Sequence, residues 1–300
     1  MAGKKFGRKK GFFVKDLNSF FELARIEHGV MYLFGLLIGA ALAGWDIYST
    51  NSFYLIIPAA LATLFIEIGA FSLNDYFDKK SDTINKRIDR PIVRGTVSPV
   101  AAKIIGILFL FLGNLLALML SFFSVIETFV IVFLFSVGSI FYNLKMKKYA
   151  VIGNVFIGIT MALPFLFGAL VIGNFTESVA VLAGIAFVVG VGREIMKDIQ
   201  DIKGDKKTGA KTLPLVIGKK KSVYSVIACY FMAILLSIIP FFTFFKGEIY
   251  YFLVLLTDLI LIIVSAKLLR YQNLSTLKFG RKWTLVAIII GLIAFLLSSF

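Results

Sequence analysis

The chain has 300 residues, of which 59% are hydrophobic and 16% are charged, and its mean hydropathy is +0.91. Soluble domains carry nearer ~25% charged residues, so this composition excludes a water-exposed globular particle and predicts an all-α polytopic membrane protein. The net charge of +15 is spread over five short loops, which argues against nucleic-acid binding. The single cysteine, Cys229, has no partner for a disulfide.

Nine apolar segments are long enough to cross the roughly 30 Å hydrocarbon core of a bilayer as helices. In chain order they cover residues 28–45, 53–73, 102–122, 125–142, 151–172, 178–195, 222–245, 249–268 and 283–300. The sequence therefore predicts a basic amino-terminal segment, residues 1–27, followed by a nine-helix transmembrane domain, residues 28–300.

The basic residues test this topology, because Lys and Arg concentrate in cytoplasmic loops. With nine spans, all but one of the 32 Lys and Arg residues fall on one face of the membrane, and only Lys246 falls on the other. We therefore expect a multi-pass cell-membrane protein with its amino terminus in the cytoplasm and its carboxyl terminus outside. The basic start of the chain either contacts anionic lipid headgroups or serves only as a topology anchor.

Two clusters of acidic residues lie at the cytoplasmic ends of predicted spans. The first follows the second span and reads NDYFDKKSD over residues 74–82, and the second follows the sixth span and reads DIQDIKGD over residues 198–205. At about 100° per residue, the oxygen-bearing side chains of each cluster form one stripe on a helix. Stacked carboxylates repel one another, and Mg²⁺ shared with a diphosphate would offset this repulsion. Neutralisation of solvated loop acids by the adjacent Lys and Arg is the alternative.

The two clusters resemble the NDxxDxxxD and DxxDxxxD motifs of the UbiA superfamily of intramembrane prenyltransferases. This resemblance implies a ring of helices around a central cavity, capped on the cytoplasmic side and open sideways to lipid. It also implies magnesium ligands on both motifs, at Asn74, Asp75, Asp78, Asp82, Asp198, Asp201 and Asp205. The four expected to act directly in catalysis are Asp78, Asp82, Asp201 and Asp205.

Six further residues are candidates for binding phosphate groups, namely Arg25, Arg90, Arg94, Tyr142, Lys145 and Lys197. Tyr142 and Lys145 resemble a Tyr/Lys element that grips the donor diphosphate in the family. Arg25 stands where the family often has a basic residue. The others would add charge-assisted hydrogen bonds to phosphate oxygens. Two of them, Arg90 and Arg94, could equally be topology anchors, and Lys197 could instead pair with Glu194.

Within the superfamily, the segments Gly192–Pro214 and Arg90–Gly95 most resemble the archaeal digeranylgeranylglyceryl phosphate synthases. That resemblance implies Mg²⁺-dependent transfer of a geranylgeranyl group from its diphosphate to the hydroxyl of geranylgeranylglyceryl phosphate. The implied partners are a prenyl diphosphate donor, a lipid-phosphate acceptor and membrane lipids, with no nucleic acid and no obligate protein partner. One departure is the sequence RIEH at residues 25–28, where many relatives carry an Arg-Pro step and an Asn.

Two other functions compete with this interpretation. An aromatic prenyltransferase of the same superfamily would share the magnesium chemistry and differ in its acceptor. A secondary transporter would place its coupling acids near the bilayer midplane, whereas these clusters lie at helix ends. Glu67 and Asp258 do lie within predicted spans, where an acid is costly; functional and packing roles are both open for them.

Overall fold

The structure is a computed structural model that describes residues 11–46, 50–84, 86–146, 149–243 and 247–299. Lys246 and the basic start of the chain, residues 1–10, lie outside the described residues. The described helices are α1 (Leu17–Ala24), α2 (Ile26–Leu42), α3 (Thr50–Ile84), α4 (Pro91–Arg94), α5 (Pro99–Ser121), α6 (Glu127–Leu144), α7 (Ile152–Ile172), α8 (Glu177–Thr208), α9 (Leu213–Val216), α10 (Lys219–Thr243), α11 (Glu248–Arg270) and α12 (Leu274–Ser299).

The helices reproduce the predicted membrane spans. Across the described ranges, eight helices are long and apolar enough to cross a membrane: α3, α5, α6, α7, α8, α10, α11 and α12. A ninth span is formed if α1 and α2 count as one, since they meet at a bend of 51°. The bend is at Arg25, whose φ of 48° is left-handed and interrupts the helix. The prediction of an all-α protein with about nine transmembrane helices is confirmed.

Two helices continue well beyond the apolar segments that predicted them. The second and sixth spans were expected to end near residues 73 and 195, whereas α3 runs for 35 residues to Ile84 and α8 runs for 32 residues to Thr208. Hydropathy indicates where a helix leaves the hydrocarbon core. The helix itself can continue beyond that point, because its backbone hydrogen bonds do not depend on apolar side chains. Both acidic clusters are therefore held on rigid helical extensions.

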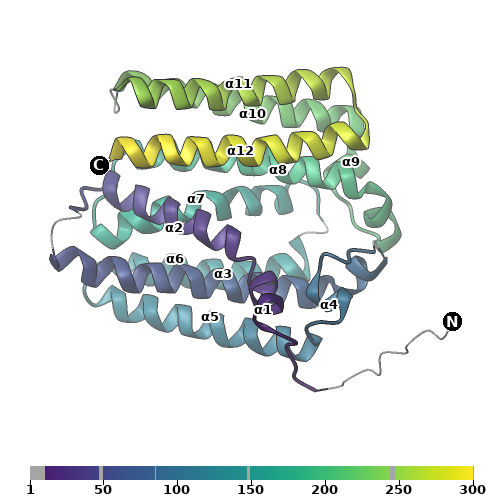
Figure 1. Ribbon diagram of the computed structural model, residues 1–300, viewed down its shortest axis with the longest axis horizontal. Coiled ribbons are helices and arrows are strands. Elements are labelled where there is room, and N and C mark those ends of the chain that lie inside the picture. The colour runs from purple at the N-terminus through teal and green to yellow at the C-terminus, as the bar shows by residue number, and fades with distance from the viewer. Residues whose placement is uncertain (1–10, 47–49, 85, 147–148, 244–246, 300) are drawn as a thin grey trace.

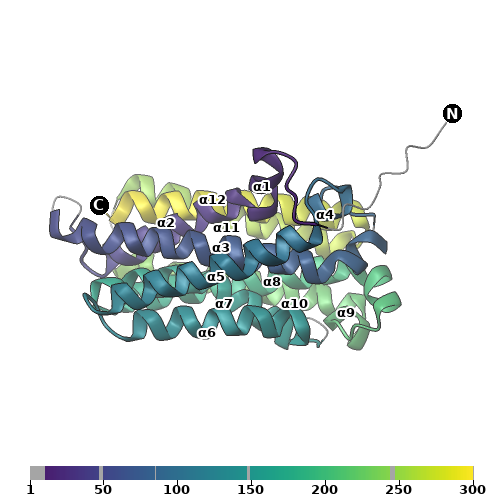
Figure 2. The same ribbon diagram turned by 90° about the horizontal axis from the view of Figure 1, so that it is seen from below.

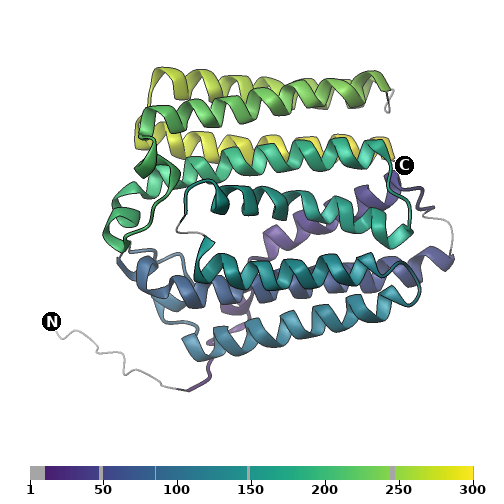
Figure 3. The same ribbon diagram turned by 180° about the vertical axis from the view of Figure 1, so that it is seen from behind.

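The long helices run side by side in one bundle, with α10 and α11 along one edge and α3, α5 and α6 along the other (Figure 1). The pairs with the most extensive packing are α3 with α5, α7 with α8, α8 with α10, α11 with α12, and α2 with α7. All three views place α4 and α9 at the end of the bundle opposite the carboxyl terminus (Figures 2 and 3). Since α4 follows α3 and α9 follows α8, this end carries both acidic clusters.

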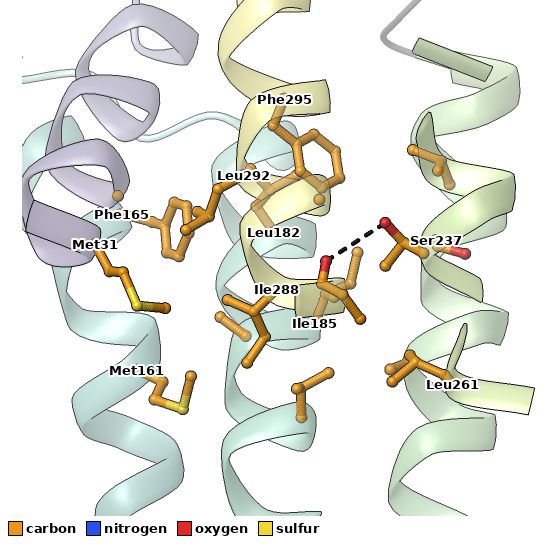
Figure 4. Close-up of a pocket in the computed structure, with 18 of the residues that line it drawn as sticks. Met31, Met161, Phe165, Leu182, Ile185, Ser237, Leu261, Ile288, Leu292 and Phe295 are labelled. Carbon is orange, nitrogen blue, oxygen red and sulfur yellow. Dashed lines mark hydrogen bonds between the residues drawn. The ribbon is translucent and has the colours of Figure 1, made fainter. Parts of the chain in front are cut away.

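The helices enclose apolar interior space. One cavity of about 110 Å³ lies between α2, α7, α8, α10, α11 and α12. Figure 4 shows side chains such as Met31, Phe165 and Leu292 lining it. A second cavity of about 60 Å³ lies between α2, α3, α6 and α7, and both cavities border on Tyr32 and Pro164. Helices surrounding an interior cavity are what the superfamily resemblance implied.

The described part of the amino-terminal segment packs against the bundle at the same end as α4. Leu23 and Ala24 of α1 are buried with Ile92 of α4 and Val97 beyond it. The backbone N–H of Ser98 also donates to the carbonyl oxygen of Phe13 at 2.9 Å. These contacts place the start of α2, and with it Arg25, beside the acidic end of α3.

Close contact between α2 and α7 depends on glycine. A Cβ atom at Gly39 would overlap the backbone carbonyl of Phe165, and one at Gly168 would overlap that of Leu36. We expect Gly39→Val to destabilise the protein by about 3 kcal/mol, because backbone atoms cannot yield as a side chain can. Thermal unfolding in detergent measures this loss. Gly184→Ala is the matched control, since its Cβ would meet only Leu236 at an ordinary 3.7 Å, and an equal loss there would contradict the packing argument.

Candidate active site

The two acidic stripes face each other at one end of the bundle. The guanidinium of Arg87, just beyond α3, interacts electrostatically with Asp82 of the first stripe and with Asp201 of the second. In the same way, the phenol of Tyr142 lies within reach of the charges of Asp78 and Asp198. Residues more than 100 positions apart in the sequence are therefore near one another, at the end of the bundle where α4 and α9 lie.

Two arginines converge on the first stripe. Asp75 is only 1% exposed, and its Oδ1 accepts a hydrogen bond from Nη2 of Arg25 at 2.7 Å. The Nη1 atom of Arg90 lies 3.5 Å from the same oxygen, and Arg25 also approaches Oδ1 of Asn74 at 3.4 Å. Burial and the neighbouring Arg25 lower the pKa of Arg90. Two guanidiniums held this close make a site that favours an anion.

Asparagines connect the stripes to neighbouring helices. Asn74 donates from Nδ2 to Oδ1 of Asn143 on α6 at 2.7 Å, and Asn154 on α7 donates to Asp198 at 2.8 Å. Neither Asn143 nor Asn154 was among the predicted site residues. The available signal was a polar side chain at the end of an apolar span that faces the acidic clusters, and both fit that description. They fix the orientation of Asn74 and Asp198.

The second stripe is supported by a partly buried polar cluster. Nζ of Lys197 donates to Oε1 of Glu194 at 2.6 Å, and the same oxygen accepts from the hydroxyl of Tyr142 at 3.4 Å. Lys197 thus makes the Glu194 pair that was the alternative to phosphate binding. Asp205, further along α8, accepts a hydrogen bond at 3.2 Å from the hydroxyl of Thr212, the residue before α9. Burial raises the pKa of Asp205 to about 6, against the opposing effect of that hydrogen bond.

Two predicted phosphate-binding residues lie away from this cluster. Arg94, at the end of α4, pairs with Glu22 of α1, and both side chains are more than one-third exposed. Lys145, the residue at which α6 ends, is also exposed. The structure therefore brings together Arg25, Arg90, Tyr142 and Lys197 with the acids, and leaves Arg94 and Lys145 at the surface.

The donor set fits magnesium that is shared with a phosphate ligand. In the ranges that the structure describes, no three His, Cys, Asp or Glu residues come together as a complete metal site. Mg²⁺ ordinarily takes one or two carboxylates, keeps waters and shares phosphate oxygens with its substrate. Each stripe offers such a pair, Asp78 with Asp82 and Asp201 with Asp205. The electrostatic effect of Asp78 on Asp82, and of Asp201 on Asp205, is the like-charge repulsion that a cation would relieve.

Comparisons with known proteins agree with this geometry. The digeranylgeranylglyceryl phosphate synthase of Archaeoglobus fulgidus is 36% identical over 292 residues, covering 95% of this chain and 96% of that protein. A solved structure described as a digeranylgeranylglyceryl phosphate synthase is 30% identical, covers 94% of this chain and 98% of the other, and has a TM-score of 0.72.

A more distant structure shares the fold. It is a UbiA homolog from Archaeoglobus fulgidus bound to GPP and Mg²⁺, with a TM-score of 0.65 and 18% identity, covering 92% of this chain and 99% of that one. The model of the UbiA prenyltransferase family matches residues 32–286. The resemblance seen in the two aspartate motifs is thereby confirmed, and this multi-pass membrane protein belongs to the UbiA prenyltransferase family.

Proposed function

We propose that this protein transfers a geranylgeranyl group from geranylgeranyl diphosphate to the free hydroxyl of geranylgeranylglyceryl phosphate, the second ether-forming step of archaeal lipid synthesis. The observation that carries the proposal is the meeting of two acidic stripes and two arginines at one end of a bundle with an apolar interior. The proteins of this name to which the chain is similar along nearly its whole length support the choice of substrates.

The chain's own residues would bind the donor at its diphosphate end. Asp78 and Asp82 on one side, and Asp201 and Asp205 on the other, would hold Mg²⁺, which when bound would neutralise the charge of the leaving diphosphate. Arg25 and Arg90 would donate to the phosphate oxygens from the first stripe. The polar groups would thus concentrate at the cytoplasmic end.

The apolar interior would hold the hydrocarbon and exclude water from the reacting carbon. An allylic carbon that loses diphosphate becomes cationic, and water would capture it if it were present. The lining of the larger cavity is almost entirely hydrocarbon, with Tyr32, Ser237, Thr257 and Asp258 as its polar exceptions. Exclusion of water lets the oxygen of the acceptor hydroxyl bond to that carbon as the diphosphate leaves, and the hydroxyl proton would pass to the released diphosphate or to a nearby carboxylate.

The same proposal fixes an orientation in the membrane. With the basic loops in the cytoplasm, the amino terminus and the acidic stripes face the cytoplasm and the carboxyl terminus lies outside. Residues 1–27 then form the basic cytoplasmic segment, and residues 28–300 form the transmembrane domain. The diphosphate donor would be bound from the cytoplasm, and no protein partner is needed for the step.

A transfer assay tests the proposal. Purified protein is incubated with radiolabelled geranylgeranyl diphosphate and Mg²⁺, and geranylgeranylglyceryl phosphate or 4-hydroxybenzoate is offered as acceptor. We expect label in a doubly prenylated glyceryl phosphate, loss of transfer in EDTA, and recovery when Mg²⁺ is restored. Label that moves only onto 4-hydroxybenzoate would assign the protein to aromatic prenyl transfer. Full activity in EDTA would contradict the magnesium site.

A further inference from the structure

The acid Glu67 lies deep in α3 with no partner of its own. It is only 2% exposed, and neither of its carboxyl oxygens has a hydrogen-bond partner. It lines the cavity of about 60 Å³ between α2, α3, α6 and α7. An acid buried in a membrane helix without a partner is costly, and such residues usually serve a ligand or a reaction. The mechanism described above does not use it.

The position of Glu67 relates it to the acidic stripe. It precedes Asn74 by seven residues, which is two helical turns, so the two side chains share one face of α3 about 10 Å apart along the axis. The neighbouring α2 has Gly29 at this level, where a Cβ would lie 2.9 Å from Oε2 of Glu67. Arg25 stands one turn before Gly29. Glu67 therefore lies on the membrane side of the proposed diphosphate site.

The other polar groups of this cavity are already engaged. Thr63 donates its hydroxyl hydrogen to the carbonyl of Ala59 at 2.9 Å, and Thr160 donates to the carbonyl of Ile157 at 2.8 Å. Tyr32 is hydrogen-bonded to Thr160. The rest of the lining is apolar apart from Glu67 itself. The described residues that line this cavity thus offer Glu67 no free hydrogen-bond donor, and a bound molecule can supply one.

The proposed substrates differ in what they could offer at this position. A prenyl chain is a hydrocarbon with no donor, and an ionised diphosphate offers only acceptor oxygens. The free hydroxyl of the acceptor is a neutral donor of the right kind. Resting on the function proposed above, we propose that Glu67 binds the acceptor through a hydrogen bond from its free hydroxyl to a carboxyl oxygen of Glu67.

This contact would fix the depth at which the acceptor hydroxyl lies in the site. The first prenyl carbon of a donor held between the stripes projects from the diphosphate toward the membrane, and so toward the level of Glu67. A hydroxyl held by Glu67 presents its oxygen to that carbon from the membrane side. The carboxyl thereby selects an alcohol-bearing lipid over a lipid that has the same chain without a hydroxyl.

The test compares the acceptor with an analogue in which the free hydroxyl is replaced by hydrogen. Wild-type protein is expected to bind the acceptor about ten- to a hundredfold more tightly than the analogue, as judged by the acceptor KM and the analogue's inhibition constant. In Glu67→Leu this discrimination should disappear. Glu67→Gln, which keeps one carbonyl oxygen at the site, should retain part of it. Binding of the unreactive donor geranylgeranyl thiolodiphosphate should stay unchanged in both variants.

Glu177→Gln is the control, because this acid is exposed at the far end of α8 and lines neither cavity. Its discrimination should equal that of the wild type.

If Glu67→Leu still distinguishes the two lipids, or if donor binding falls as far as acceptor binding, Glu67 does not bind the hydroxyl. If Glu67→Leu does not fold, full wild-type discrimination in Glu67→Gln overturns the proposal. A wild-type protein that transfers nothing to the glyceryl phosphate defeats the proposed function instead.

Discussion

Replacement of Asp201 by Asn, or of Asp78 by Asn, is expected to reduce prenyl transfer at least about a thousandfold, which corresponds to about 4 kcal/mol of transition-state stabilisation. The reason is the charge of the leaving group. A diphosphate departs only as its negative charge is neutralised, and an amide in place of a carboxylate removes one negative ligand from the cation that would do this. The helix should survive the change, because Asn has nearly the same shape and relieves like-charge repulsion along the stripe.

Initial rates at saturating donor and acceptor, over a range of Mg²⁺ concentrations, measure this effect. The variants should elute from size exclusion in detergent as the wild type does. Glu177→Gln is the control on the same helix as Asp201, since Glu177 is exposed at the opposite end of α8 and should leave the rate unchanged. Near-native rates in both Asp201→Asn and Asp78→Asn would exclude the two stripes as the metal site.

The spans could be predicted closely because hydrocarbon thickness sets a length that the sequence must match. The fifth span was expected at residues 151–172 and is found at Ile152–Ile172. The extensions of α3 and α8 could not be found in this way, because their charged residues carry no apolar signal. Their helical period was nonetheless visible in the spacing of the acids, which is why each cluster could be predicted as one stripe.

The site was predicted less completely than the spans. The acids and Arg25 were recognisable from motifs, but whether a basic residue faces the site depends on tertiary packing. Arg90 and Arg94 have similar sequence surroundings, yet Arg90 reaches Asp75 and Arg94 pairs with Glu22 at the surface. Arg90 precedes α4 with an extended backbone, whereas Arg94 lies in the last turn of α4, so the two side chains meet different neighbours. Asn143 was missed for the same reason, since its partner lies on another helix.

The buried pair of Asp75 and Arg25 should matter far more for stability than the surface pair of Arg94 and Glu22. Asp75 is 1% exposed and Arg25 is 14% exposed at the side chain, whereas Arg94 and Glu22 are 37% and 47% exposed. Asp75→Ala leaves two guanidiniums, Arg25 and Arg90, close together without their carboxylate. We expect a loss of about 3 to 5 kcal/mol, because a buried charge without its partner keeps the full cost of desolvation.

Arg94→Met should cost less than about 1 kcal/mol, because water already solvates both members of an exposed pair. Thermal unfolding of the two variants in the same detergent makes the comparison, and the double variant Arg25→Met, Asp75→Leu separates charge from packing. If the loss in Asp75→Ala comes from unpaired charge, the double variant should recover part of the stability, while any donor affinity that depends on Arg25 should stay low. Equal losses in Asp75→Ala and in the double variant would mean that packing at this position, rather than the pairing of charges, stabilises the end of α3 that carries the first stripe.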